Sequence, residues 1–357
     1  RGDGLTMSQG KRKTELSQLN LIFCMMVLWS HCSGHPITVL DHSSWQYGLM
    51  ICLQRLTFVS VSGFFFLSGL KLTLSKKTPP PYGRYVLSRV KSIFLPYLLA
   101  VLIYYVYFIR HGYFSFSLTD LAGYIVRGDL SSPFYFVIAL AQFVLLTPVF
   151  RWLARRWSPV LLLPLGFGIT LLSGQYFNDV LQALSPTLSF GYSDRLFTTF
   201  LIYYLAGCCA GQYYEKFLDL LRDNRPLILV CGAVFAAADV FFSWGHFVLG
   251  KPTLFLELLH MLYQISAIPA IYVLVLDHPR ALSPVEQRMD RASFLVYLYH
   301  SLVILVFNDW AWRLGIGKVS VQFVLRVLVV YTFTFAACML WQQALGMLKG
   351  KLPATSK

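Results

Sequence analysis

The sequence predicts an all-α membrane protein, a polytopic bundle of about ten transmembrane helices forming one domain. Apolar residues make up 57% of the chain, aromatic residues 16% and charged residues only 13%, whereas a soluble domain carries roughly 25% charged residues. Long apolar segments recur along the chain, and most Lys and Arg residues lie in alternate connecting segments. The composition also excludes a disordered chain, which would need low hydrophobicity and high charge.

Ten segments are apolar enough to cross a hydrocarbon core, which takes about 17 to 25 helical residues. Helices are expected because they satisfy their backbone polar groups internally, and the alternating pattern of a lipid-facing barrel strand is absent. The fifth segment is short and rich in Gly and Pro. The predicted spans are 16–34, 48–70, 92–109, 133–150, 159–174, 196–214, 226–243, 253–276, 293–309 and 319–346.

The first span could be read as a cleaved signal peptide, because Lys11, Arg12 and Lys13 precede an apolar run that small residues follow. Nine further spans favour a retained signal anchor. The predicted organisation is a cytoplasmic tail at 1–15, a single transmembrane domain at 16–348 and a second cytoplasmic tail at 349–357.

The distribution of basic residues predicts the orientation. On the side of the N-terminus lie 22 of the 30 Lys and Arg residues, and basic loops mark the cytoplasmic side. Both termini are therefore expected in the cytoplasm. The net charge of +14 then reflects topology and attraction to anionic lipid, which argues against nucleic-acid binding.

The seven cysteines all fall within or beside predicted spans, without metal-ligand spacing or a disulfide framework. Small apolar side chains are the expected role. Cys32 and Cys52 end neighbouring spans on the same side, so a bridge between them stays open.

Ionisable groups within a bilayer are costly and each is a candidate functional residue. Five of them belong to the outer half of the predicted bundle and suggest a polar chamber open to the outside: His31, Arg55, Asp239, Glu257 and Arg326. The other reading is that the arginines form structural ion pairs with the acids or extend to the interface. His260 and His300 complete the set.

A basic cluster follows the second span at the opposite surface. It comprises Lys71, Lys76, Lys77, Arg84, Arg89 and Lys91. Basic side chains fixed at a helix end can hold phosphate groups. The alternative is a topology signal that also binds lipid headgroups.

Five short motifs occur in order along the chain. They are the span from Leu19 to His31; Gly63-Phe64-Phe65-Phe66-Leu67-Ser68-Gly69; Arg89-Val90-Lys91 before Leu95-Pro96-Tyr97; Pro133-Phe134-Tyr135-Phe136 with Pro148; and Ser293-Phe294 with Tyr297-Leu298-Tyr299-His300. In this order they resemble the acyltransferase-3 family of integral-membrane O-acyltransferases and cover most of the chain.

One position departs from the family pattern. The family usually has an arginine eleven residues before its first-span histidine, and this chain has Asn20 there. Eleven residues bring a helix to within about 20° of three full turns, so positions 20 and 31 share a face about 16 Å apart. Asn20 keeps hydrogen bonding but lacks the positive charge of the family arginine, and this difference is expected to change either the affinity for the acyl donor or the identity of that donor.

The resemblance implies transfer of a small acyl group, commonly acetyl, from cytoplasmic acyl-CoA to a hydroxyl of an extracytoplasmic sugar or cell-surface glycan. His31 would be the general base, since its ordinary pKa of about 6.5 suits that role, and Arg55 would stabilise the oxyanion. Asn20, Arg84, Arg89 and Lys91 would bind the donor. The residues expected near the acceptor are Glu257, Tyr297, His300 and Arg326.

No permanently bound cofactor and no metal is expected, with acyl-CoA as a substrate and the plasma membrane of a bacterium as the location. Two other functions stay open. A transporter or flippase for a small anion or lipid-linked sugar would also need intramembrane charges, and a non-catalytic polymer-export partner is the third reading. Acyl-CoA consumption dependent on His31 would discriminate the enzyme from both.

Overall fold

A computed structural model describes residues 13–74, 81–278 and 280–351, with side chains described to residue 347. Within these ranges the chain is helical and contains no β-strand. Seven helices are long and apolar enough to cross a membrane, and two bent helix pairs raise the number to nine. The all-α membrane bundle predicted from the sequence is confirmed, with seven to nine spans where ten segments were proposed.

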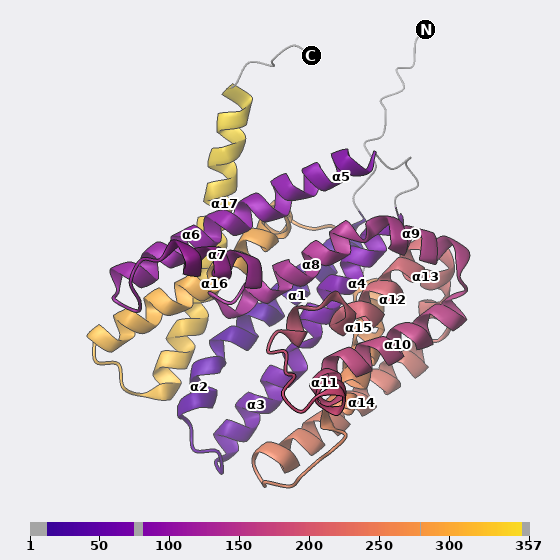
Figure 1. Ribbon diagram of the computed structural model, residues 1–357, viewed down its shortest axis with the longest axis horizontal. Coiled ribbons are helices and arrows are strands. Elements are labelled where there is room, and N and C mark those ends of the chain that lie inside the picture. Colours follow the sequence, from indigo (N-terminus) through magenta and orange to yellow (C-terminus); the bar gives the residue numbers. More distant parts are fainter. Residues whose placement is uncertain (1–12, 75–80, 279, 352–357) are drawn as a thin grey trace.

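The N-terminal third supplies two spans. Helix α1 (Thr14–Cys32) continues after one residue into α2 (Gly34–Val39), and α3 (Trp45–Thr57) continues into α4 (Val59–Leu74). Helix α2, helix α3 and the turn after α14 (Arg225–Phe247) lie at the lower end of the molecule in Figure 1, opposite α5 (Tyr82–Arg89) and α9 (Thr147–Arg156).

The third span is longer than predicted. Helix α5, a π-helical turn (Val90–Phe94) and α6 (Leu95–Arg110) form a continuous rod from Tyr82 to Arg110. Arg84, Arg89 and Lys91 of the predicted inner loop therefore stand on helical turns. A π-helical turn is rare and is often found at functional sites.

The middle of the chain is broken into short pieces. Helix α7 (Leu118–Arg127) and the segment Ser132–Leu145, which ends in α8 (Tyr135–Leu145), meet at 57°, and α10 (Pro159–Gln175) meets α11 (Phe177–Leu184) at 71°. Pro148 opens α9 at its first turn, where proline is tolerated. The span predicted at 133–150 is thus divided into α8 and α9.

The segment predicted as a span at 196–214 is divided into a short 3₁₀ helix (Phe197–Phe200) and α12 (Leu201–Gln212), and α13 (Tyr214–Asp223) follows. Twelve residues are too few to cross a bilayer. Hydropathy suggested a span because α12 is apolar, but the helix is buried among other helices.

Glycines bring α4 and α12 into close contact. A Cβ atom added at Gly69 would lie 2.1 Å from the carbonyl oxygen of Tyr204, and one at Gly207 would lie 2.0 Å from that of Phe66. Small residues at a membrane helix interface allow such approach. The Phe-rich motif of the sequence is therefore partly a packing motif.

The last third contains four long helices, α14, α15 (Leu256–Asp277), α16 (Pro284–Arg313) and α17 (Val319–Lys351). Ser283 and Glu286 form a capping box at the start of α16. Helix α16 packs against both α1 and α17, so residues from the two ends of the chain meet in one interface.

Candidate functional site

The contact between α1 and α16, which we call the α1–α16 seam, brings together four of the residues selected from the sequence: Asn20, His31, Tyr297 and His300. Ser293, Tyr297 and His300 are spaced by four and three residues, so they share one face of α16. Asn20 and His31 are the corresponding positions on α1. The seam runs from Asn20 at one end to His31 at the other.

His31 and His300 form one pair. Their ring centroids lie 4.8 Å apart, with the planes at 52°. His300 is fully buried, its Nδ1 lies 3.1 Å from the Val296 carbonyl oxygen and its Nε2 lies 3.3 Å from Ser301 Oγ. In the neutral ring Nδ1 carries the proton, because the carbonyl can only accept, and Nε2 accepts from the serine hydroxyl. These two bonds fix the orientation of His300 beside His31.

Asn20 lies at the other end of the seam and donates two hydrogen bonds through Nδ2. The acceptors are Asp290 Oδ1 at 2.7 Å and Ser293 Oγ at 2.8 Å. Beside it is a cavity of about 140 Å³, the Asn20 pocket, which is lined by Asn20, Phe64, Leu67, Ser68, Lys71, Phe136, Leu140, Ser293, Phe294 and Tyr297. Four of the five sequence motifs therefore supply its wall.

Tyr297 lies between the Asn20 pocket and the histidine pair. Its hydroxyl donates to the Pro133 carbonyl oxygen at 2.6 Å, and its ring centroid is 5.1 Å from that of Phe136 and 6.0 Å from that of His300. The hydroxyl is engaged, so the ring is the part of Tyr297 that faces the pocket and the histidines.

Arg55 belongs to a separate ion network. Its Nη1 lies 2.9 Å from Glu257 Oε1 and its Nη2 lies 3.4 Å from Asp239 Oδ1. The other oxygen of Asp239 lies 2.9 Å from His260 Nδ1. Arg55, Asp239 and His260 are buried, whereas the Glu257 side chain is about half exposed. The guanidinium is already paired with two carboxylates, which weakens the physical case for Arg55 as an oxyanion donor.

Arg326 is arranged differently. It is 1% exposed, and its Nε and Nη2 donate to Asn308 Oδ1 at 3.1 and 2.9 Å. Its Nη1 is buried and has no hydrogen-bond partner among the described residues. Asn308 follows His300 by eight residues on α16, about 12 Å along the helix. Arg326 is therefore a buried cation with a free donor beyond the histidine pair.

Apart from Asn20 on α1, the residues predicted to bind the donor stand on the first turns of the third span. Arg84, Arg89 and Lys91 are exposed, and Arg89 lies over the Tyr85 ring at 5.1 Å from the centroid. Lys71 lines the Asn20 pocket. Lys76 and Lys77 lie outside the described residues.

Sequence reasoning missed three polar residues that hold the site together. Asp290 anchors Asn20, Ser301 contacts His300, and Asn308 anchors Arg326. All three lie on α16 among apolar residues. Their polarity within a span was the available signal, but their partners depend on which helices pack together. The seven cysteines are free thiols, Cys32 and Cys52 included.

A protein-family model described as an acyltransferase domain matches residues 15–341. The chain belongs to the acyltransferase-3 family. This match runs from the start of α1 into α17 and includes both ends of the α1–α16 seam. Together with the seven to nine apolar helices, it makes the chain a multi-pass membrane protein with an acyltransferase domain.

Two relatives extend this comparison. A Staphylococcus aureus protein named as a probable poly-beta-1,6-N-acetyl-D-glucosamine export protein is 24% identical over 307 residues, covering 82% of this chain and 83% of that protein. A Bacillus subtilis protein, YfiQ, named as a candidate membrane-bound acyltransferase, is 23% identical over 305 residues, covering 82% and 81%. No solved structure matches the chain.

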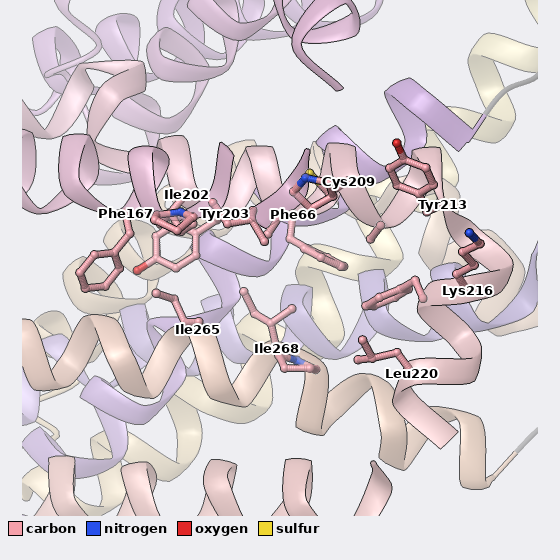
Figure 2. A pocket seen from close by; sticks show the side chains of 17 residues that line it. Phe66, Phe167, Ile202, Tyr203, Cys209, Tyr213, Lys216, Leu220, Ile265 and Ile268 are labelled. Atoms are coloured by element: carbon pink, nitrogen blue, oxygen red, sulfur yellow. The ribbon is translucent and has the colours of Figure 1, made fainter. Parts of the chain in front are cut away.

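A larger cavity of the acyltransferase domain lies apart from the seam. It has a volume of about 610 Å³ and is lined mainly by apolar side chains of α4, α10, α12, α13 and α15. Figure 2 shows Tyr213 and Lys216 at one end of it and Phe167 at the other. None of the residues selected as site candidates lines this cavity. If the site were chosen by cavity volume alone, this cavity would be selected and the histidine pair would be missed.

Proposed function

We propose that this protein, in a bacterial plasma membrane, transfers a small acyl group such as acetyl from cytoplasmic acyl-CoA to a hydroxyl of an extracytoplasmic sugar or cell-surface glycan. The observation that supports this most is the α1–α16 seam, which joins a pocket beside Lys71 to the His31 and His300 pair. A thioester donor and a hydroxyl acceptor need such a base between them.

In the proposed reaction His31 acts as the base. The hydroxyl oxygen bonds to the thioester carbonyl carbon while its proton passes to the imidazole of His31. The carbon–sulfur bond then breaks, and the thiolate of CoA leaves and takes that proton. His300 lies 4.8 Å from His31, between centroids, and would position its ring.

The donor is a polyanion with a long pantetheine arm. We expect its phosphates at the basic end of the bundle, near Arg84, Arg89 and Lys91, with the arm entering the Asn20 pocket. Asn20 supplies hydrogen bonding there without charge, so phosphate attraction at this depth would fall to Lys71 instead.

On the acceptor side, Glu257 is the most exposed member of its ion network, and Arg326 has a free Nη1 among the described residues. A free, buried guanidinium N–H can stabilise a developing oxyanion or hold a sugar hydroxyl. We therefore assign Arg326 this role in preference to Arg55, and keep Glu257 as a hydrogen-bond acceptor for a sugar.

One observation favours a second function, export of a polysaccharide or a lipid-linked sugar. The Staphylococcus aureus relative is named as an export protein. An exporter would move substrate without cleaving a thioester, so the two functions make opposite predictions for acyl-CoA consumption.

The test compares O-acyl groups on cell-wall and exopolysaccharide fractions from cells with and without the protein. Loss of one O-acyl group, restored by the wild-type protein and not by His31→Ala, would support the enzyme. His278→Ala is a matched control, because His278 is exposed and, among the described residues, its side chain bonds to a backbone carbonyl, that of Leu274. Unchanged O-acylation with loss of secreted polymer would favour export.

A further inference from the structure

A cavity between α5 and α9 lies outside the residues assigned so far. It has a volume of about 510 Å³, within the range of small-molecule sites. We call it the arginine pocket; its lining is Tyr82, Tyr85, Thr147, Pro148, Arg151, Trp152, Arg155 and Arg156. We propose that the arginine pocket binds the phosphorylated adenosine part of the acyl-CoA donor. This inference rests on the proposed function and deepens it.

The positive charge of the arginine pocket favours an anionic ligand. Three arginines line it and no Asp or Glu does. Within the described part of the chain, none of the three forms an ion pair or a side-chain hydrogen bond. Guanidinium groups bind phosphate in a bidentate manner, and several phosphates on one ligand would satisfy several arginines at once.

The pocket also offers flat aromatic surfaces. Tyr82, Tyr85 and Trp152 line it together with the arginines. The guanidinium of Arg151 lies 5.9 Å from the centroid of the Tyr85 ring, and that of Arg89 lies 5.1 Å from the same ring. A nucleobase stacks on aromatic rings and on guanidinium planes. Phosphates joined to a planar base match both features of the lining.

Two hydrogen bonds hold the walls together. Tyr82 donates its hydroxyl proton to the Leu145 carbonyl oxygen at 2.7 Å, and Thr147 Oγ1 donates to the Tyr85 hydroxyl at 3.3 Å. Both join α5 to the junction of α8 and α9. The spacing between the aromatic wall and the arginine wall is therefore fixed by the fold.

The position of the pocket suits a donor with a long arm. Phe136 and Leu140 of α8 line the Asn20 pocket, and Thr147 at the start of α9 lines the arginine pocket. Thr147 follows Leu140 by seven residues across the junction of α8 and α9, which corresponds to about 10 Å of helical rise. Adenosine in the arginine pocket would leave the pantetheine arm next to the Asn20 pocket and the seam.

Anionic lipid is the competing occupant, since lipid phosphates also bind arginine at a membrane surface. A diacyl lipid has no planar base, however, so it would leave the Tyr and Trp faces without a partner. Three arginines without an ion pair among the described residues, combined with three aromatic rings, favour the nucleotide.

The experiment measures binding of CoA, 3′-dephospho-CoA and adenosine 3′,5′-bisphosphate to the full-length protein in detergent. Arg151→Ala and Arg155→Ala are each expected to weaken CoA binding about tenfold or more, because each removes a charge-assisted contact. Trp152→Ala should weaken CoA and the bisphosphate alike. Arg288→Ala is the control, an exposed arginine of α16 outside the pocket.

A second arm uses an acyl-pantetheine thioester, which lacks the nucleotide. The arginine variants should transfer its acyl group as fast as the wild type, which also shows that they are folded. Unchanged CoA affinity in both variants would overturn the arginine pocket while leaving the proposed function intact. Loss of CoA binding upon addition of anionic vesicles, with no response to the bisphosphate, would assign the pocket to lipid. If neither thioester is consumed by the wild type, the proposed function itself fails, whatever the bisphosphate does.

Discussion

The rings of His31 and His300 lie 4.8 Å apart between centroids, although the two residues are separated by most of the chain. One comes from the end of α1 and the other from the middle of α16. His300 is held by Val296 and Ser301, whereas His31 is only partly buried. The better held ring therefore supports the more accessible one.

We predict that His31→Ala retains folding and CoA binding but loses acyl transfer by about two orders of magnitude or more, because a positioned base contributes about 10²- to 10⁴-fold. His300→Gln should lower transfer less, since it removes only support. The double variant should be no slower than His31→Ala, as expected for residues that act as one unit. The measurement is the rate of thiol release from acetyl-CoA in the presence of an acceptor glycan.

Wild-type transfer by His31→Ala would remove His31 as the base. In that case the base would be sought at His300, the other histidine of the pair.

A second prediction concerns Asn20. Replacing it with Asp would place a second carboxylate where Asn20 now donates to Asp290 Oδ1 at 2.7 Å. We expect a loss of at least about 2 kcal/mol in the free energy of unfolding, since a hydrogen bond becomes a repulsion in a buried site. Thermal unfolding in detergent measures it. Asn20→Leu, which removes the donor without adding charge, should cost less; equal losses for the two variants would contradict the electrostatic explanation.

The sequence predicted the positions of Asn20 and His31 on a common face because helical periodicity is a local property. It also predicted that Arg55, Asp239 and Glu257 would lie at similar depth. The sequence could not decide which groups form pairs. In the structure Arg55 forms ion pairs with Asp239 and Glu257, and Arg326 donates hydrogen bonds to Asn308. Partner choice depends on which helices pack together, and that is not encoded in any one segment.

The number of spans shows the same limit. Hydropathy reports how apolar a segment is, and α12 is as apolar as a span. Its twelve residues are buried because Gly69, Gly207 and Gly211 let it pack closely on α4. A short buried helix and a short membrane span have similar composition, so hydropathy predicted more membrane spans than the structure contains in its described residues.

We predict that Arg55→Ala reduces the free energy of unfolding by about 3 to 5 kcal/mol, because Asp239 is fully buried and would lose its strongest cationic partner. Glu257→Gln should cost at most about 1 kcal/mol, since the Glu257 side chain is about half exposed. Both are measured as denaturation midpoints in detergent. A stable Arg55→Ala protein that has lost transfer would instead return Arg55 to a catalytic role.

A fourth prediction tests the contact between α4 and α12. Gly207→Ala should destabilise the protein by about 1 to 3 kcal/mol, because the new Cβ would lie 2.0 Å from the carbonyl oxygen of Phe66 and backbone must move. Gly168→Ala on α10 is the matched control, with open space around the added atom. It should be neutral or slightly stabilising, as alanine is the better helix former. Equal effects of the two substitutions would contradict the packing argument.

The last prediction concerns orientation, on which the donor argument depends. The exposed basic residues Arg84, Arg89 and Lys91 share one end of the bundle with α9, opposite α2 and α3 (Figure 1). If the positive-inside rule holds, this end faces the cytoplasm. A cysteine introduced near Ser283 should then be shielded from an impermeant thiol reagent in intact cells, and one near Ser117 should be labelled. A cysteine near Ser75, which lies outside the described residues, should be shielded as well.

Because the seven native cysteines are mostly buried, the unmodified protein gives the background for each measurement. Labelling near Ser75 and Ser283 with protection near Ser117 would reverse the orientation, and the arginine pocket would then face away from the cytoplasmic pool of acyl-CoA.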